Sequence, residues 1–268
     1  MASREHWQNE LMETSRARGR GKLAVFRPAK RDEWEWAQNK LREEPHLLER
    51  DQQAIELAFA GGQFYVLEDE NGDLAGCGAL WDVASGTIKP DPGVPCIELG
   101  AIWIAEDFRG WGLGRVLGQI GIAEAIAKDP DMEIYTGAVS TNPKSERNVR
   151  WLGFTNATGA QRIWWPRLCN FGKGCASKER ARQAGRRCCV QAVKLPAYWK
   201  RDAVRAFLSF VDFEPLRSSS AYRGRPAIGE AGPLLTLSQE NGDILTLALQ
   251  ELNSLREREA LKTWLSRK

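Results

Sequence analysis

The sequence predicts a mixed α/β domain in which helices flank a partly parallel sheet. β-rich and helical segments alternate along the first 160 residues, which is typical of this fold class. One strand, CIELGAIWIA at 96–105, is apolar on both faces and β-branched, so we expect it at the centre of the sheet. The glycine-rich stretch FRGWGLGRVLG at 108–118 follows it and opens a helix.

Each element follows from its local pattern. Trp34, Ala37 and Leu41 share one face of a helix. The pair Asn71-Gly72 marks a hairpin between two β-rich runs. In chain order, the sequence predicts a strand at 22–29, helices at 30–44 and 47–62, a hairpin at 63–83, a strand at 96–105, a helix at 114–129, a strand at 133–140 and a helix at 142–154.

Beyond residue 160 the pattern changes. We expect a last strand at 187–195 and a helix at 198–213. A final helix is predicted from near Asp243, with an apolar face formed by Leu245, Ala248, Leu249, Leu252 and Leu255. The predicted parts are a basic N-terminal arm at 1–21, a main domain at 22–195 with a basic insert at 160–187, and a mostly helical C-terminal extension at 196–268.

The composition is that of an ordinary globular protein. The 268 residues are 43% hydrophobic and 27% charged, and the net charge of +3 is too small to indicate nucleic-acid binding by itself. No stretch has the apolar length of a membrane span, and the first 22 residues lack the apolar core of a signal peptide. We therefore expect a cytoplasmic protein without a membrane partner.

The glycine-rich stretch predicts an anion site. A strand that runs into glycines and then into a helix points several backbone amides the same way, at the positive end of the helix dipole. A Walker A loop would need a lysine that is missing here, and the glycines at 110, 112, 114 and 118 do not match the Rossmann spacing. The stretch therefore suits a phosphate bound by another class of motif.

Two patterns resemble those of the GNAT acetyltransferase superfamily, and the resemblance covers about residues 22–195. They are Arg109-x-x-Gly112-x-Gly114 after an apolar strand, and the later Asn142-x-x-Ser145, Val149 and Gly153-Phe154. The resemblance implies a splayed sheet and an acetyltransferase that uses acetyl-CoA or another acyl-CoA. It also implies transfer to an amine by direct attack on the thioester.

The same resemblance implies where the cofactor would bind. Pyrophosphate would lie on the amides of the glycine turn, pantetheine along the fourth strand, and Asn142 near the pantetheine arm. The implied cofactor-binding residues are Ile102, Ile104, Arg109, Gly110, Gly112, Gly114, Arg115 and Asn142.

Transfer to an amine needs a base for the amine proton. The family often has a glutamate on its fourth strand, and Glu98 occupies that strand here. On an alternating strand Glu98 shares a face with Ile102 and Ile104. The alternative is a partly buried glutamate that only pairs with a nearby arginine.

An acid is needed for the thiolate leaving group. The family's usual tyrosine falls at Val149, so this sequence departs from the pattern. Tyr135 and Ser145 are the candidate substitutes, with Ser140 as a third, each by proximity in sequence. Without an acid, the domain is alternatively a non-catalytic CoA-binding or protein-interaction module.

The acceptor amine is not defined by any motif. The acceptor is a small molecule, a protein or a nucleic acid. A second copy of this chain is a further candidate partner, in a homodimer. The basic, tryptophan-containing insert at 160–187 fits either a nucleic-acid contact or a solvated face. We predict no metal, because the spacing of four cysteines is not a common zinc pattern: Cys169, Cys175, Cys188 and Cys189.

Overall fold

The fold is described here from a computed structural model. It describes residues 21–44, 47, 50, 52–82, 95–139, 143–156, 183, 190–211, 233–239 and 242–267. Outside these ranges lie nearly all of the basic insert, the predicted N-terminal arm except Gly21, and the four cysteines Cys169, Cys175, Cys188 and Cys189.

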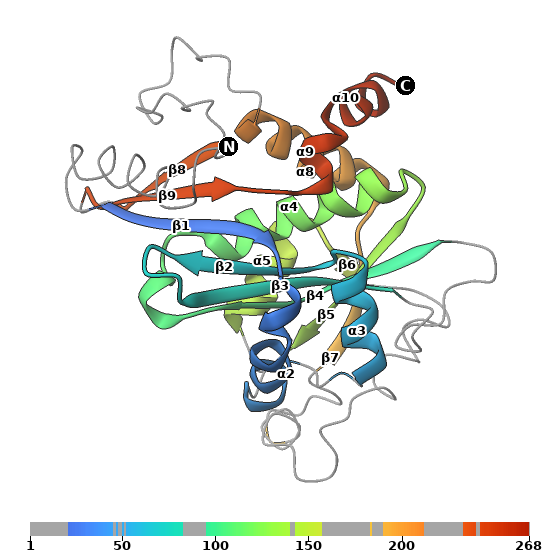
Figure 1. The fold of residues 1–268 in the computed structure, drawn as a ribbon. Helices are drawn as coiled ribbons and strands as arrows, with labels where there is room; N and C mark the ends of the chain where they lie inside the picture. The colour runs from blue at the N-terminus through green and yellow to red at the C-terminus, as the bar shows by residue number, and fades with distance from the viewer. Residues whose placement is uncertain are drawn as a thin grey trace.

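A mixed sheet forms the centre of the molecule (Figure 1). Its strands are β1 (Gly21–Pro28), β2 (Phe64–Asp69), β3 (Leu74–Asp82), β4 (Cys96–Ile104), β5 (Glu133–Val139), β6 (Thr155–Asn156), β7 (Val190–Lys194), β8 (Leu234–Ser238) and β9 (Ile244–Leu249). They lie in the order β6-β7-β5-β4-β3-β2-β1-β9-β8. The pairs β4/β5 and β1/β9 are parallel and the others are antiparallel. The predicted mixed, partly parallel sheet is therefore confirmed.

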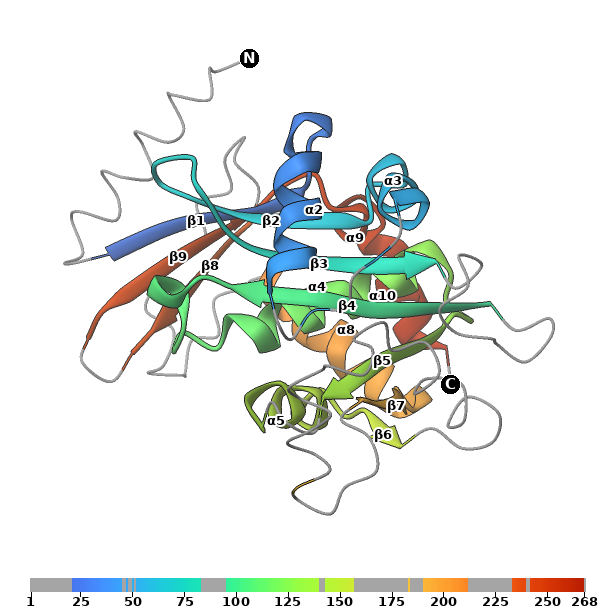
Figure 2. The ribbon, with the colours of Figure 1, turned by 90° about the horizontal axis from the view of Figure 1, so that it is seen from below.

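Helices cover both faces of this sheet (Figures 1 and 2). One face bears α2 (Trp34–Glu43), which follows the short helix η1 (Arg31–Glu33), and α3 (Gln52–Ala60). The other face bears α4 (Leu113–Lys128), α5 (Pro143–Trp151), α8 (Ala197–Val211), α9 (Asn253–Arg256) and α10 (Arg258–Ser266). The larger hydrophobic core lies on this second face, which we call the α4 face.

The contact between α4 and β4 depends on a glycine. A Cβ atom built at Gly121 would lie 2.6 Å from Cδ1 of Leu99, closer than side-chain atoms pack. Ile120, Ile122 and Ile126 fill the space around it and are almost completely buried. The small residue thus lets the helix lie directly on the central strand, which fixes the direction in which the amino end of α4 points.

The predicted helix from Asp243 is wrong. Residues 244–249 form strand β9, and helix α9 begins only at Asn253. β9 lies between β1 and β8 in the sheet, and its side chains Leu245, Leu247 and Leu249 join the core of the α4 face. These leucines alternate as on a strand, but Leu245, Leu249 and Leu252 also match a helical spacing, so the local sequence fits both elements. Likewise β7 is not the last strand, because β8 and β9 follow it.

Candidate functional site

β4 and β5 are joined at one end only. Their parallel pairing runs from Cys96 and Glu133 to Glu98 and Tyr135. Within the described part of both strands, pairing ends there, although β4 continues to Ile104 and β5 to Val139. Figure 2 shows the two strands diverging toward their carboxyl ends. The splayed sheet expected from the sequence is present, and its opening exposes the backbone edge of β4.

The glycine turn lies at the wide end of this opening. It links β4, through the short helix η3 (Glu106–Phe108), to the amino end of α4. Gly110 and Gly112 have φ angles of +92° and +75°, which residues other than glycine rarely adopt. Gly112 is the N-cap of α4. A Cβ atom at Gly112 would meet no protein atom within 4 Å. The turn therefore leaves open space beside helix amides that have no partner within the helix.

Two arginines flank the turn. The Nε of Arg109 donates to the carbonyl oxygen of Ile104 at 3.0 Å. The guanidinium of Arg115 lies over the ring of Trp151 on α5, 4.9 Å from its centroid. Both arginines are exposed, so their positive charges add to the helix dipole on the same side of the molecule.

The prediction that Glu98 shares a face with Ile102 and Ile104 is wrong. The pairing of β3 with β4 shifts register between Cys77 and Ala79, and Ala101 has a φ of +54°. This is a β-bulge, and one extra residue reverses which face the later side chains occupy. Ile102 and Ile104 pack on the α4 face, whereas Glu98 lies on the face of α2 and α3.

Glu98 is buried and only partly paired. Its Oε1 accepts a hydrogen bond from Nη2 of Arg50 at 2.5 Å, and the Arg50 guanidinium lies over the ring of Trp81. Its Oε2 is buried and has no hydrogen-bond partner within the described chain. Burial raises the pKa of Glu98 above its ordinary value, and the Arg50 cation opposes this shift. The second interpretation from the sequence, a buried glutamate that pairs with an arginine, is thus present, while Oε2 is left without a partner among the described residues.

The other catalytic candidates are separated in the structure. Tyr135 is the pairing neighbour of Glu98 on β5 and is fully buried, and its hydroxyl donates to Oε2 of Glu133 at 2.5 Å. Ser145 lies in the first turn of α5 and is half-buried. Val149 is buried in the core of the α4 face, so the position of the usual tyrosine offers no hydroxyl.

Some of the residues predicted for the site lie outside the described ranges, and two features near the site were not predicted from the sequence. Asn142 and Ser140 are not described, and the four cysteines are also outside. Arg50 was missed, since nothing in its surrounding sequence indicates a partner for Glu98. The hairpin between β8 and β9 was also missed, although it brings Gln239 within 3.5 Å of where a Cβ of Gly110 would lie.

Two classes of feature are not found in the described chain. Across these residues, no three histidine, cysteine, aspartate or glutamate side chains gather as a metal site. Among the helices that the structure describes, none has both the length and the apolar character needed to cross a membrane.

Comparison with known proteins gives one family. The model of the acetyltransferase (GNAT) family matches residues 28–154. This range includes β4, the glycine turn, α4, β5 and α5. A search of curated protein sequences finds no match.

Several solved structures are similar in part. A spermidine N-acetyltransferase chimera from Vibrio cholerae SpeG and hSSAT has 16% identity and a TM-score of 0.43, covering 65% of this chain and 98% of that one. Arabidopsis thaliana Naa50, in complex with a bisubstrate CoA analogue, has 13% identity, a TM-score of 0.45 and the same coverages. N-acetylglutamate synthase from Neisseria gonorrhoeae, complexed with coenzyme A and N-acetyl-glutamate, has 20% identity and a TM-score of 0.40, covering 65% of this chain and 35% of that one. These values are too low to indicate an acceptor.

The splayed β4–β5 pair and the glycine turn lie within the residues that the family model matches. The chain therefore carries a GNAT-family acetyltransferase domain at residues 28–154.

Proposed function

We propose that this protein is an N-acetyltransferase that moves an acetyl group from acetyl-CoA to an amine. The observation that best supports the proposal is the opening between β4 and β5, which ends at the glycine turn. The family model over residues 28–154 supports the same reaction class.

The residues present fit acetyl-CoA. The space beside Gly112 and the amides at the start of α4 suit a pyrophosphate, and Arg109 and Arg115 supply positive charge nearby. The backbone edge of β4 at Ile102 and Ile104 has no strand beside it in the described chain, so it can hydrogen-bond the pantetheine amides. Gly110, Gly114 and Asn142 complete the proposed binding residues.

Glu98 is the proposed general base. Its carboxylate lies on the face of α2 and α3, opposite Ile97 and Leu99, which pack on the α4 face. The acceptor amine would therefore approach the thioester from that face, and its proton would pass to Oε2 of Glu98 directly or through a water. The amine nitrogen then forms a bond to the carbonyl carbon, the carbon–sulfur bond breaks, and the sulfur leaves as a thiolate.

Protonation of the thiolate is assigned to Tyr135 first and Ser145 second. Tyr135 is the cross-strand neighbour of Glu98, at the point where the two strands separate. Its hydroxyl already donates to Glu133, whose carboxylate also accepts from Lys194. When Tyr135 gives up its proton, the nearby Lys194 cation balances the negative charge on the tyrosine oxygen. Ser145 lies at the amino end of α5, beyond the end of β5.

Acetyl-CoA turnover tests the proposal. The full chain is incubated with acetyl-CoA and with amines of three classes: a polyamine, a peptide amino terminus and an α-amino acid. Free thiol is measured together with the mass of the product. We expect stoichiometric thiol and an amine heavier by one acetyl group with at least one class. Tight binding of acetyl-CoA without thiol release from any of them would instead support the non-catalytic binding module.

A further inference from the structure

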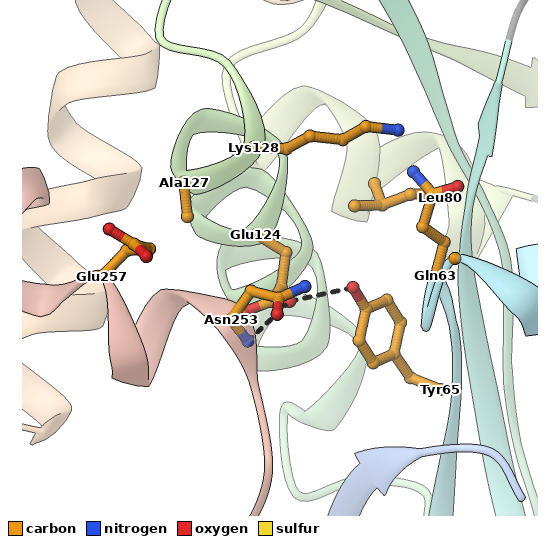
Figure 3. A pocket seen from close by; sticks show the side chains of 9 residues that line it. Gln63, Tyr65, Leu80, Glu124, Ala127, Lys128, Asn253 and Glu257 are labelled. Carbon is orange, nitrogen blue, oxygen red and sulfur yellow. Dashed lines mark hydrogen bonds between the residues drawn. The ribbon is translucent and has the colours of Figure 1, made fainter.

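A second pocket lies on the α4 face, away from the glycine turn (Figure 3). Its volume is about 300 Å³, within the lower range of small-molecule sites. Its floor is buried and its mouth is exposed. The lining residues are Gly61, Gln63, Tyr65, Leu80, Glu124, Ala127, Lys128, Asn253 and Glu257.

The floor of this pocket is held rigidly. The carboxylate of Glu124 accepts the Tyr65 hydroxyl at 3.0 Å and the backbone amide of Ser254 at 2.6 Å. It also accepts the backbone amide of Asn253 at 3.2 Å, so one side chain ties α4 to β2 and to the start of α9. Three partners therefore hold this carboxylate in place.

One polar group in the floor is unsatisfied. Gln63 is only 6% exposed, and within the described residues its amide nitrogen has no acceptor. A buried donor without a partner costs about 1–3 kcal/mol, so such groups are uncommon in folded proteins. Gln63 is one of the residues that line the pocket, and a ligand that offers an acceptor to its amide nitrogen would remove the cost.

The charges at the mouth are of opposite sign and lie at opposite ends. In Figure 3 the Lys128 ammonium extends toward the sheet side, where Gln63 also lies, and Glu257 lies on the side of the C-terminal helices. Among the described residues, neither Lys128 nor Glu257 forms a salt bridge. One end of the pocket therefore offers hydrogen-bond donors and a cation, and the other end offers a carboxylate.

We propose that this pocket binds a small zwitterion of the α-amino acid class. The ligand carboxylate would accept from Gln63 and Lys128, and its ammonium would face Glu257. The site is independent of the proposed acetyl transfer. Glu124 and Lys128 lie 12 and 16 residues along the chain from Gly112, about 18 and 24 Å along the axis of α4. Leu80 in its floor lies on the opposite sheet face from Glu98.

Calorimetric titration of the full chain without acetyl-CoA tests this site. The probes are free L-α-amino acids, the corresponding amino acid amides, which lack the carboxylate, and the corresponding deaminated acids, which lack the ammonium. We expect at least one amino acid to bind with a Kd below about 1 mM. Its amide and its deaminated acid should each bind at least about tenfold more weakly.

Four variants locate the binding. Gln63→Met and Lys128→Met should weaken it at least about tenfold, whereas Lys144→Met, at an exposed position of α5, should not. Glu257→Gln should weaken binding of the amino acid but not of its deaminated acid. Lys128 is exposed, so its variant tests the site even where Gln63→Met changes folding. Three results would each overturn the proposal. They are that no amino acid binds, that an amino acid and its amide bind equally well, and that binding is unchanged in Gln63→Met and Lys128→Met.

Discussion

Glu98 shows how a single residue can satisfy two interpretations at once. Its pairing with Arg50 is what a structural glutamate would show. Its Oε2 has no hydrogen-bond partner among the residues that the structure describes, which is what a base would need. A purely structural buried carboxylate is normally hydrogen-bonded through both oxygens. The orphaned oxygen therefore favours the catalytic interpretation, and substitution can separate the two.

Glu98→Gln should lower kcat by about 10²- to 10⁴-fold while acetyl-CoA still binds, because the amide cannot accept the amine proton. Glu68→Gln is the matched control, since Glu68 is also a buried glutamate paired with an arginine, Arg27. Both variants should lose stability of about 3 kcal/mol, because each weakens a buried ion pair. Steady-state kinetics and chemical unfolding measure the two effects. Equal losses of kcat in both variants would show that Glu98 acts only through the fold.

The pH dependence of kcat/KM gives a second test at this residue. Burial raises the pKa of Glu98 above its ordinary value, so the base becomes protonated and kcat/KM falls as pH decreases through that raised value. The Arg50 cation favours the charged form and lowers the pKa. Arg50→Met should therefore move the acid limb of the profile to higher pH. An acid limb that stays in place, or moves to lower pH, would contradict the assignment.

Among the elements, the glycine turn has the clearest local requirement. Gly112→Leu places a side chain in the open space beside the α4 amides and forces a left-handed φ of +75°. We expect the affinity for coenzyme A to fall at least about tenfold, with a strain cost of about 1–3 kcal/mol. Calorimetry with coenzyme A measures the first effect and thermal unfolding the second.

Gly62→Leu is the control for strain alone. Gly62 has a φ of +62°, and a Cβ atom there would also meet nothing within 4 Å. It lies directly after α3, outside the turn that leads from β4 into α4. The free energy of unfolding should fall by similar amounts in both variants, but only Gly112→Leu should lose affinity for coenzyme A. Equal affinity in the two variants would refute the placement of the pyrophosphate.

The elements predicted from sequence were those with a strong local signal. The hairpin at Asn71-Gly72, the central strand β4 and the turn into α4 each have a distinctive turn residue or an apolar run, and they are present. The bulge at Ala101 has no such signal, because its positive φ is imposed by pairing with β3. Strand β9 was missed for a related reason: its leucines fit both a strand and a helix spacing, and pairing with β1 and β8, which are distant in the sequence or not predicted, decides between them.

In the whole molecule, the C-terminal segment is part of the same sheet as the acetyltransferase domain. β9 pairs in parallel with β1 over Gly21–Phe26, and the α8 side chains Ala203, Val204 and Phe207 join the core of the α4 face. Glu124 also binds the backbone at the start of α9. We therefore expect these parts to unfold together rather than as separate domains.

Leu247→Ala in β9 and Leu67→Ala in β2 test this cooperativity. Both leucines are completely buried, and the free energy of unfolding of each variant should fall by about 2–5 kcal/mol. Fluorescence and circular dichroism should report one shared unfolding transition that shifts by similar amounts in the two variants. An earlier, separate transition that appears only in Leu247→Ala would show that the C-terminal segment is an independent unit.

A crystal structure of the full chain with coenzyme A bound tests the central claim most directly. We expect the pyrophosphate within hydrogen-bond distance of the backbone amides between Gly110 and Arg115. The pantetheine arm should lie against the edge of β4 at Ile102 and Ile104, with the sulfur in the opening beyond Glu98 and Tyr135. Coenzyme A bound elsewhere, with the glycine turn making no contact to its phosphates, would contradict the account.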